Sequence, residues 1–221
     1  MQPIIILMGA PGSGKGTQAK LIAKAYNYGH ISTGELLRGL EQEKPNDPKI
    51  EGVFADMKKG VLVPDWLIYD LAFKEMDKYL AKGQGVVLDG AIRNLEQAKA
   101  YQEYFLTKGL QLTDILVLEV SITEGESIDR LTKRRTCSDC GEIIPWSSDT
   151  KSITTCPRCG GELLTRQDDN IVTIKARIEE QGNEVLKPLV GYYQQLGVFA
   201  AVDGMQSIEE VWRQVDVMLK K

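Results

Sequence analysis

Residues 9–17 read GAPGSGKGT and come directly after the apolar run Ile4–Met8. This stretch matches the G-x-x-x-x-G-K pattern, and a helix-forming segment, TQAKLIA at residues 17–23, follows it. Glycines let backbone N–H groups converge on phosphate oxygens without side-chain clashes, and a helix N-terminus adds favourable partial charge. A strand, a glycine-rich turn and a helix in this order favour a phosphate-binding loop over a turn that binds nothing.

The rest of the chain continues to alternate short apolar runs with helix-length segments. Four more runs, bounded by Gly, Asp, Ser or Thr, are expected to be strands: Tyr28–Ile31, Gly85–Leu88, Ile115–Val120 and Phe199–Val202. With the first run they predict an α/β fold with a five-stranded parallel sheet flanked by helices. Two segments, 32–62 and 136–169, interrupt the alternation. They are expected to be small insertions at the sheet edge where open α/β sheets bind ligands.

Composition excludes several classes of protein. The 221 residues carry a net charge of −4, so the chain has no global attraction for nucleic acid or an anionic membrane. Any anion site must therefore be built locally from placed arginines and backbone amides. No apolar run approaches the roughly 20 residues of a membrane span. The N-terminus lacks the basic lead of a signal peptide, so we expect a cytoplasmic protein.

All cysteines lie in the second insertion. They form two Cys-x-x-Cys pairs, each followed by glycine: Cys137, Cys140, Cys156 and Cys159. Four thiolates at this spacing predict a tetrahedral Zn²⁺ site, with Fe as the competing metal. Four protein ligands leave no open position, so the metal is expected to be structural and to stiffen a segment too small for its own core. Disulfides and redox-active pairs are the alternatives.

Several motifs resemble those of the adenylate kinase family, in the same order and spacing over nearly the whole chain. They are GAPGSGKGTQ, ISTGELLR at Ile31–Arg38, GVLVPD at Gly60–Asp65, VLDG at Val87–Gly90 with Arg93 and Gln97, DRLTKRR at Asp129–Arg135, TRQDD at Thr165–Asp169 and VDG at Val202–Gly204. Gly16 stands where many phosphate loops have Ser or Thr, and this G-K-G-T form is the one that nucleoside monophosphate kinases use.

The resemblance implies a P-loop kinase fold and reversible, Mg²⁺-dependent transfer of the γ-phosphoryl group of ATP to AMP, giving two ADP. It implies a monomer whose partners are ATP, AMP and ADP, without nucleic acid or membrane. The implied core consists of residues 1–31, 63–135 and 170–221. Residues 32–62 would be a helical insertion that binds the acceptor, and 136–169 a zinc-binding lid.

The resemblance also implies roles for individual residues. Those implied to bind ATP are Gly12, Ser13, Gly14, Lys15, Gly16, Thr17, Arg130, Arg134, Ile143, Ile144 and Gln206, with Asp89 organising Mg²⁺ through water. Those implied to bind AMP are Thr33, Arg38, Val61, Leu62, Val63, Gly90, Arg93, Gln97, Arg166 and Arg177. The implied catalytic set is Lys15, Arg93, Arg130, Arg134, Arg166 and Arg177.

Two further expectations concern chemistry. Arg130 and Arg134 are four residues apart on one predicted helix and would share a face. No general base is expected, because the acceptor phosphate is already ionised at neutral pH, and the single histidine, His30, is interpreted as structural.

Particular residues weigh on the rival functions. A kinase for UMP or CMP is the nearest rival, because Arg93-Asn94 is a pairing seen in pyrimidine-specific relatives, whereas Thr33 favours AMP. Ala91-Ile92 stands where the family usually has Phe-Pro, which predicts weak acceptor binding or looser base selectivity. A zinc-ribbon module for nucleic acid or a protein partner is disfavoured, because residues 136–169 carry three basic and six acidic side chains. Retention of Lys15 and Asp89 argues against a degenerate nucleotide sensor.

Overall fold

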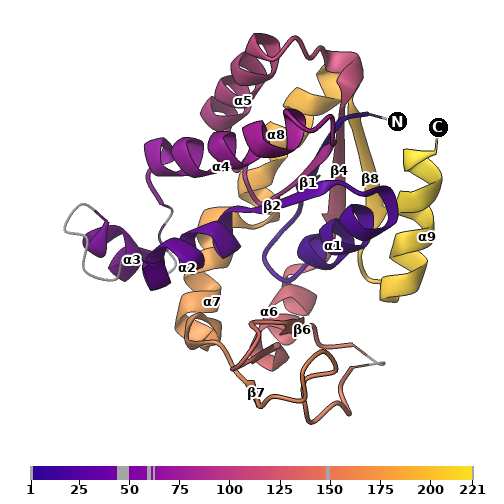
Figure 1. Ribbon diagram of the computed structural model, residues 1–221. Coiled ribbons are helices and arrows are strands. Elements are labelled where there is room, and N and C mark those ends of the chain that lie inside the picture. The colour runs from indigo at the N-terminus through magenta and orange to yellow at the C-terminus, as the bar shows by residue number, and fades with distance from the viewer. Residues whose placement is uncertain (1, 44–49, 59–60, 62, 148–149, 221) are drawn as a thin grey trace.

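The computed structural model describes residues 2–43, 50–58, 61, 63–147 and 150–220. Its main sheet is parallel, with strands in the order β2-β3-β1-β4-β8 (Figure 1). The strands are β1 (Ile4–Met8), β2 (Gly29–Ser32), β3 (Val86–Asp89), β4 (Ile115–Ser121) and β8 (Phe199–Asp203). The predicted five-stranded parallel sheet is therefore confirmed. Only the strand ends differ, by about one residue.

The central strand β1 shows why these residues form a sheet covered on both faces. All five of its side chains are buried, and successive side chains of a strand point to opposite faces. Ile4, Ile6 and Met8 join one apolar cluster, and Ile5 and Leu7 join another. Apolar side chains on both faces account for the continuous hydrophobic run in the sequence.

Helices cover each face of the sheet (Figure 1). Helices α1 (Lys15–Tyr26) and α9 (Ile208–Leu219) contribute Ile22, Val211 and Val215 to the cluster around Ile5. Helices α4 (Asp65–Leu80), α5 (Leu95–Thr107) and α8 (Asn183–Gln195) cover the other face. Helices α6 (Glu124–Lys133) and α7 (Ile171–Gln181) pack against each other beside them.

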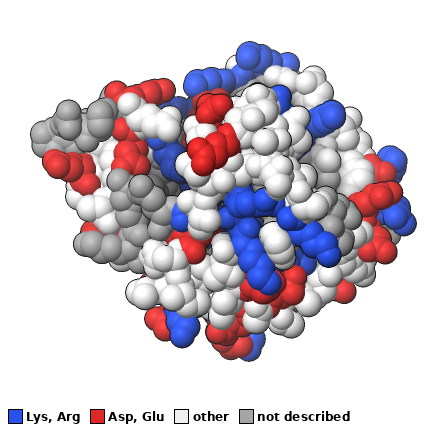
Figure 2. Space-filling model, turned by 90° about the horizontal axis from the view of Figure 1, so that it is seen from below, with Lys and Arg blue, Asp and Glu red and all other residues white. Residues whose placement is uncertain are grey.

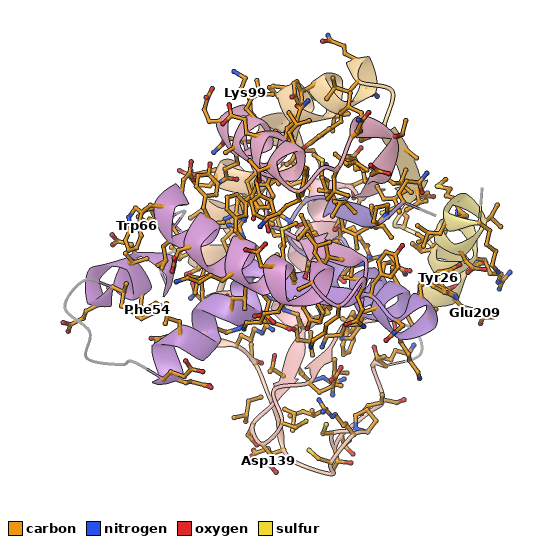
Figure 3. All side chains as sticks on the ribbon, turned by 45° about the horizontal axis from the view of Figure 1, so that its top comes forward. Tyr26, Phe54, Trp66, Lys99, Asp139 and Glu209 are labelled. Carbon is orange, nitrogen blue, oxygen red and sulfur yellow. The ribbon has the colours of Figure 1, made fainter. Side chains whose placement is uncertain are left out.

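The first interrupting segment contains α2 (Thr33–Glu43) and α3 (Glu51–Lys58). It has a small apolar cluster of its own, in which Leu37 and Phe54 pack with Val63, Leu67 and Ile68 near the start of α4. Figure 3 shows Phe54 and Trp66 together on this outlying part of the molecule. The turn-prone stretch predicted at residues 44–48 lies outside the described residues.

The second interrupting segment forms a three-stranded antiparallel sheet in the order β6-β5-β7. Its strands are only two or three residues long: β5 (Arg135–Cys137), β6 (Ile143–Ile144) and β7 (Leu163–Leu164). Two short 3₁₀ turns, Leu112–Asp114 and Gln167–Asp169, complete the elements. Within the described ranges, no helix has the length and apolar character needed to cross a bilayer.

Candidate active site

A cavity of about 500 Å³ lies where the phosphate loop, the two interrupting segments and helices α6 and α7 meet. The predicted residues that line it are Gly12, Gly14, Lys15, Gly16, Thr17, Thr33, Arg38, Asp89, Gly90, Arg93, Arg130, Arg134, Ile143, Arg166, Arg177 and Gln206. Figure 2 views the molecule from below and shows Lys and Arg side chains gathered near the middle of this face. The net acidic chain thus concentrates positive charge at one place.

The phosphate loop presents a helix N-terminus to the cavity. Gly14 is the N-cap of α1 and has φ 95°, and no side chain caps the first turn. The amides of this turn are therefore available for an anion. Lys15 Nζ donates a hydrogen bond to Ala10 O over 3.3 Å. Burial lowers the pKa of Lys15 to about 8, opposed by the charge of Asp89 and assisted by Arg93, Arg177 and Arg134.

Close approach of Asp89 explains the glycine that follows Lys15. A Cβ at Gly16 would lie 2.9 Å from Asp89 Oδ2, so a Ser or Thr at this position would collide with the carboxylate. Burial favours a raised pKa for Asp89, but interaction with His30 and the charge of Lys15 outweigh it and lower the pKa. An ionised carboxylate thus ends β3 beside the phosphate loop, in reach of a hydrated Mg²⁺.

His30 borders this carboxylate from β2. Its Nε2 lies 3.8 Å from Asp89 Oδ2, beyond hydrogen-bond distance, and has no hydrogen-bond partner among the described residues. His30 does not line the main cavity. Its expected structural role stays a prediction.

On the acceptor side, the carbonyl of Gly90 organises two predicted residues. Thr33 Oγ1 and Arg93 Nε each donate a hydrogen bond of 3.0 Å to Gly90 O. Gly90 has φ 67°, a conformation that other residues adopt at a cost. Burial, with the charge of Arg177, lowers the pKa of Arg93 to about 10. These cationic groups are poorly solvated and therefore suited to an anionic ligand.

The structure does not place every predicted acceptor residue on the cavity wall. Gln97 is 3% exposed and lies behind Arg93, with Oε1 accepting from Arg93 N over 2.7 Å and Nε2 donating to Asp65 Oδ1 over 2.7 Å. Val61 is exposed and Val63 is buried, and neither lines the cavity. Leu62 lies outside the described residues.

Ala91 and Ile92 are 2% and 3% exposed, and both belong to the main apolar cluster. Only Ile92 also lines the cavity. An aromatic residue at position 91 would therefore have to displace core side chains, and the sequence alone does not show this.

Two acidic residues that the sequence analysis did not single out hold the arginines in place. Asp169 accepts from Arg134 Nε over 2.8 Å and from Arg134 Nη2 over 2.7 Å, and it also accepts from Arg177 Nη1 over 3.2 Å. Its side chain is 0% exposed. Asp168 lies 3.4 Å from Arg177 Nη1, while Arg166 Nε donates to Thr136 Oγ1 over 2.9 Å. The adjacent carboxylates of Asp168 and Asp169, directly after Arg166-Gln167, were the available signal.

One expectation about the arginines is wrong. Arg130 lies on α6, but Arg134 is the C-cap residue with φ −63° and ψ 140°, so the two do not share a helix face. Arg134 pairs with Asp169, and β5 begins at the next residue, so the chain has already left the helix at Arg134. Arg130 instead donates to Glu126 Oε1 over 2.6 Å and to Gly204 O over 2.8 Å. Both arginines still line the cavity.

The remaining residues that were predicted to bind ATP also fall into those that line the cavity and those that do not. Ile143 and Gln206 line the cavity, whereas Ser13 and Ile144 are buried behind it, 2% and 4% exposed. The sequence analysis did not predict that Trp146 lines the cavity. Lys133 Nζ lies 5.6 Å from the centre of the Trp146 ring, and Arg135 lies 5.7 Å from it.

The four cysteines meet in one cluster, with all Sγ atoms within 4.8 Å of one another. Sγ separations of 3.4 Å (Cys137 to Cys159) and 3.6 Å (Cys140 to Cys156) exceed the roughly 2.0 Å of a disulfide. They approach the roughly 3.8 Å edge of a tetrahedron with Zn–S bonds of about 2.3 Å.

The two halves of the cluster have matching turns. Gly141 N donates to Cys137 O over 3.2 Å, and Gly160 N donates to Cys156 O over 2.8 Å. The donor set and geometry therefore fit a four-thiolate metal site.

Comparison with known proteins agrees with this geometry. A family model described as adenylate kinase matches residues 7–198. The chain is 36% identical to an adenylate kinase of Archaeoglobus fulgidus, covering 98% of each chain. It is 36% identical to that of Bacillus cytotoxicus over 97% of each chain. It is 35% identical to that of Caldanaerobacter subterraneus subsp. tengcongensis over 96% of this chain and 93% of the relative.

Proposed function

The chain belongs to the adenylate kinase family and transfers a phosphoryl group between ATP and AMP to give two ADP, and from that premise we propose how its residues divide the work. One observation carries the proposal. Lys15 and six arginines from several parts of the chain line a single cavity in a protein of net charge −4: Arg38, Arg93, Arg130, Arg134, Arg166 and Arg177.

The donor side takes ATP. The backbone amides of Gly12 to Thr17 and the Lys15 side chain bind its outer phosphates, together with Arg130 on α6 and Arg134 at its C-cap. Ile143 and Gln206 enclose the rest of the nucleotide, with Ile144 buried behind the cavity wall. Adenylate kinases use Mg²⁺ with ATP, and Thr17 and Asp89 are the groups here that would hold it, Asp89 through water.

The acceptor side takes AMP. Arg38, Arg93, Arg166 and Arg177 bind the acceptor phosphate, and bidentate guanidinium contacts fix its direction. Thr33 and Gly90 form the base side of the cavity wall. Gln97, Val61 and Val63, which lie behind or away from that wall in this structure, are proposed to contact the base as well, as Leu62 is from the sequence alone.

The reaction needs positioning and positive charge more than covalent chemistry from the protein. The ionised acceptor phosphate attacks the γ-phosphoryl group without a general base. The arginines and Lys15 stabilise the charge on the transferring group in a site that excludes water. Burial of Lys15, Arg93 and Arg166 strengthens this effect. It lowers all three pKa values, so phosphate binding relieves an unfavourable desolvation.

The remaining assignments are also proposals. Residues 32–62 act as the acceptor-binding insertion and 136–169 as a lid, with 1–31, 63–135 and 170–221 as the core. Cys137, Cys140, Cys156 and Cys159 bind one structural Zn²⁺ in that lid. The enzyme is a cytoplasmic monomer without nucleic-acid or membrane partners. Sedimentation of the purified protein tests the monomer.

A coupled assay tests the substrate assignment. Purified protein is supplied with Mg²⁺, ATP and each of AMP, CMP, UMP and GMP in turn, with and without the metal. We expect turnover with AMP that requires Mg²⁺. Preference for CMP or UMP would instead support the pyrimidine kinase, which the Arg93-Asn94 pairing keeps as the second candidate.

A further inference from the structure

Asp65 is the first residue of α4, next to Trp66, which Figure 3 labels. Its carboxylate reaches a different element, α5, where Gln97 Nε2 donates to Asp65 Oδ1 over 2.7 Å. The two residues are 32 positions apart in the chain. On its other side, the Gln97 carboxamide accepts a hydrogen bond from Arg93 N over 2.7 Å through Oε1.

Chemistry alone fixes which way this carboxamide points. An ionised carboxylate only accepts hydrogen bonds, and a backbone N–H only donates. The nitrogen of Gln97 must therefore face Asp65, and its oxygen must face Arg93. Turning the carboxamide over would place two donors against each other at Arg93 and two acceptors against each other at Asp65. At 3% exposure, little water is available to compensate.

We propose that Asp65 is a positioning residue that orients the carboxamide of Gln97 and thereby sets the purine selectivity of the acceptor site. The proposal rests on the role proposed above for Gln97 at the acceptor base, and it requires the base to reach Gln97 behind the present cavity wall. With one N–H and one lone pair committed, one N–H and one lone pair remain. In this fixed orientation they complement adenine, which offers an acceptor at N1 and a donor at the 6-amino group. A 6-oxopurine offers a donor and an acceptor in the opposite places and is rejected.

The same contact also bears on Arg93. Gln97 N is capped by Asn94 Oδ1 over 2.7 Å, and Gln97 Oε1 holds the amide of Arg93. Arg93 Nε in turn donates to Gly90 O over 3.0 Å. Asp65 therefore connects the start of α4 to the turn that presents an acceptor arginine to the cavity.

The test compares Asp65→Ala, Asp65→Asn and Gln97→Ala with the unmodified full chain, using AMP and inosine monophosphate as acceptors. Without the carboxylate, reversal of the Gln97 carboxamide sacrifices one hydrogen bond in place of two. We expect Asp65→Ala to raise KM for AMP about tenfold, the size of one hydrogen bond to a charged partner. It should also lower the AMP-to-IMP ratio of kcat/KM by a similar factor, with KM for ATP unchanged.

Asp65→Asn separates positioning from structure, because its side-chain oxygen can still accept from Gln97 Nε2. We expect it to keep KM for AMP within about threefold of wild type. Asp70→Ala is the matched control on the same helix, because its exposed carboxylate pairs only with Lys74 among the interactions seen. It should leave KM and kcat/KM unchanged for both AMP and inosine monophosphate. Thermal melts show whether each variant folds.

The outcomes discriminate between the two proposals. If Gln97→Ala loses AMP selectivity while Asp65→Ala keeps it, Asp65 does not orient Gln97 and this inference is wrong, although the acceptor assignment stands. If Gln97→Ala changes kcat/KM for neither AMP nor inosine monophosphate, Gln97 does not contact the acceptor base, and both the proposed role of Gln97 and this inference are wrong. Equal losses toward ATP and AMP in Asp65→Ala would show a general structural defect and would also overturn the proposal.

Discussion

At the scale of single residues, the burial of Lys15 that serves nucleotide binding lowers the stability of the folded protein. A buried ammonium surrounded by arginines has its pKa lowered to about 8 by burial, so its charged form is disfavoured before nucleotide binds. The unfolded chain then binds more protons than the folded chain between about pH 8 and the ordinary lysine value near 10.5. Stability therefore rises with pH through that window.

This arrangement predicts the pH dependence of turnover. The free enzyme loses the Lys15 charge as pH rises through about 8, so kcat/KM for ATP should fall there, while binding of phosphates holds the proton on and leaves kcat less affected. Lys15→Arg should retain weak activity without this alkaline limb. Lys15→Met should abolish nearly all turnover yet raise the melting temperature of the free protein near pH 7. A pH–rate series and melts of the free proteins check both effects, and a less stable Lys15→Met variant would refute the reasoning.

Asp169 is the second residue whose surroundings give a quantitative expectation. It contacts Arg134 and Arg177 and its side chain is fully buried, so Asp169→Asn removes the carboxylate that pairs with Arg134 and leaves Arg177 only the longer pair with Asp168. Breaking a buried pair costs about 3–5 kcal/mol, and kcat should fall as both arginines lose their fixed directions. Urea unfolding and steady-state kinetics measure the two effects. Asp168→Asn is the control, because its carboxylate is 32% exposed and should lose less than half as much.

At the scale of elements, the sequence predicts what local pattern controls. Strand β1 can be predicted because both faces of a central strand are buried, which gives a continuous apolar run. Helix α1 can be predicted because a helix begins where the phosphate loop ends. Strands β6 and β7 cannot be predicted from the sequence, because two-residue strands are too short to show an alternating pattern. Helix α6 ends at Lys133, and the next residue, Arg134, pairs with Asp169, which lies 35 positions further along the chain and could not be inferred from the local pattern. Contacts between distant residues, such as Asp65 with Gln97, leave no local signature.

The metal and the lid proposed for residues 136–169 give an expectation about stability, because this segment has little apolar core of its own. Its strands are two or three residues long, and Ile144, Cys137 and Cys156 are its buried apolar residues. Replacing Cys156 and Cys159 by Ser should remove one Zn²⁺ per chain and lower the melting temperature strongly, while turnover at low temperature falls much less. Metal analysis, calorimetry and steady-state kinetics at low temperature check this. Ser138→Ala, between Cys137 and Cys140, is the control. Loss of catalysis from a lid that still resists protease would contradict a structural metal.

At the scale of the whole molecule, one lysine on the core contacts both interrupting segments. Lys20 on α1 lies 3.5 Å from Glu142, in the cysteine-bearing segment, and 3.7 Å from Glu35 on α2. All three side chains line the cavity. One ion pair thus links each of the two segments to the same helix. Closure of segments over an active site sequesters the reaction from water and, in many enzymes, makes opening and product release limit turnover.

These contacts are partly exposed, which limits what they contribute. The side chains of Lys20, Glu35 and Glu142 are 36%, 43% and 26% exposed, and such pairs are worth about 0.2–1 kcal/mol each and weaken in salt. Lys20→Met should therefore raise KM for ATP and for AMP together, each by less than about fivefold, because both segments lose their tie to α1. Where opening limits turnover, kcat should rise slightly. High salt should raise both KM values of the wild type toward those of the variant and leave the KM values of the variant nearly unchanged.

Lys74→Met, whose partner Asp70 lies on the same exposed helix face, controls for loss of a surface charge. A change in KM for only one nucleotide would mean that Lys20 ties down a single segment, and a salt response equal in both proteins would mean that its ion pairs do not hold the closed arrangement.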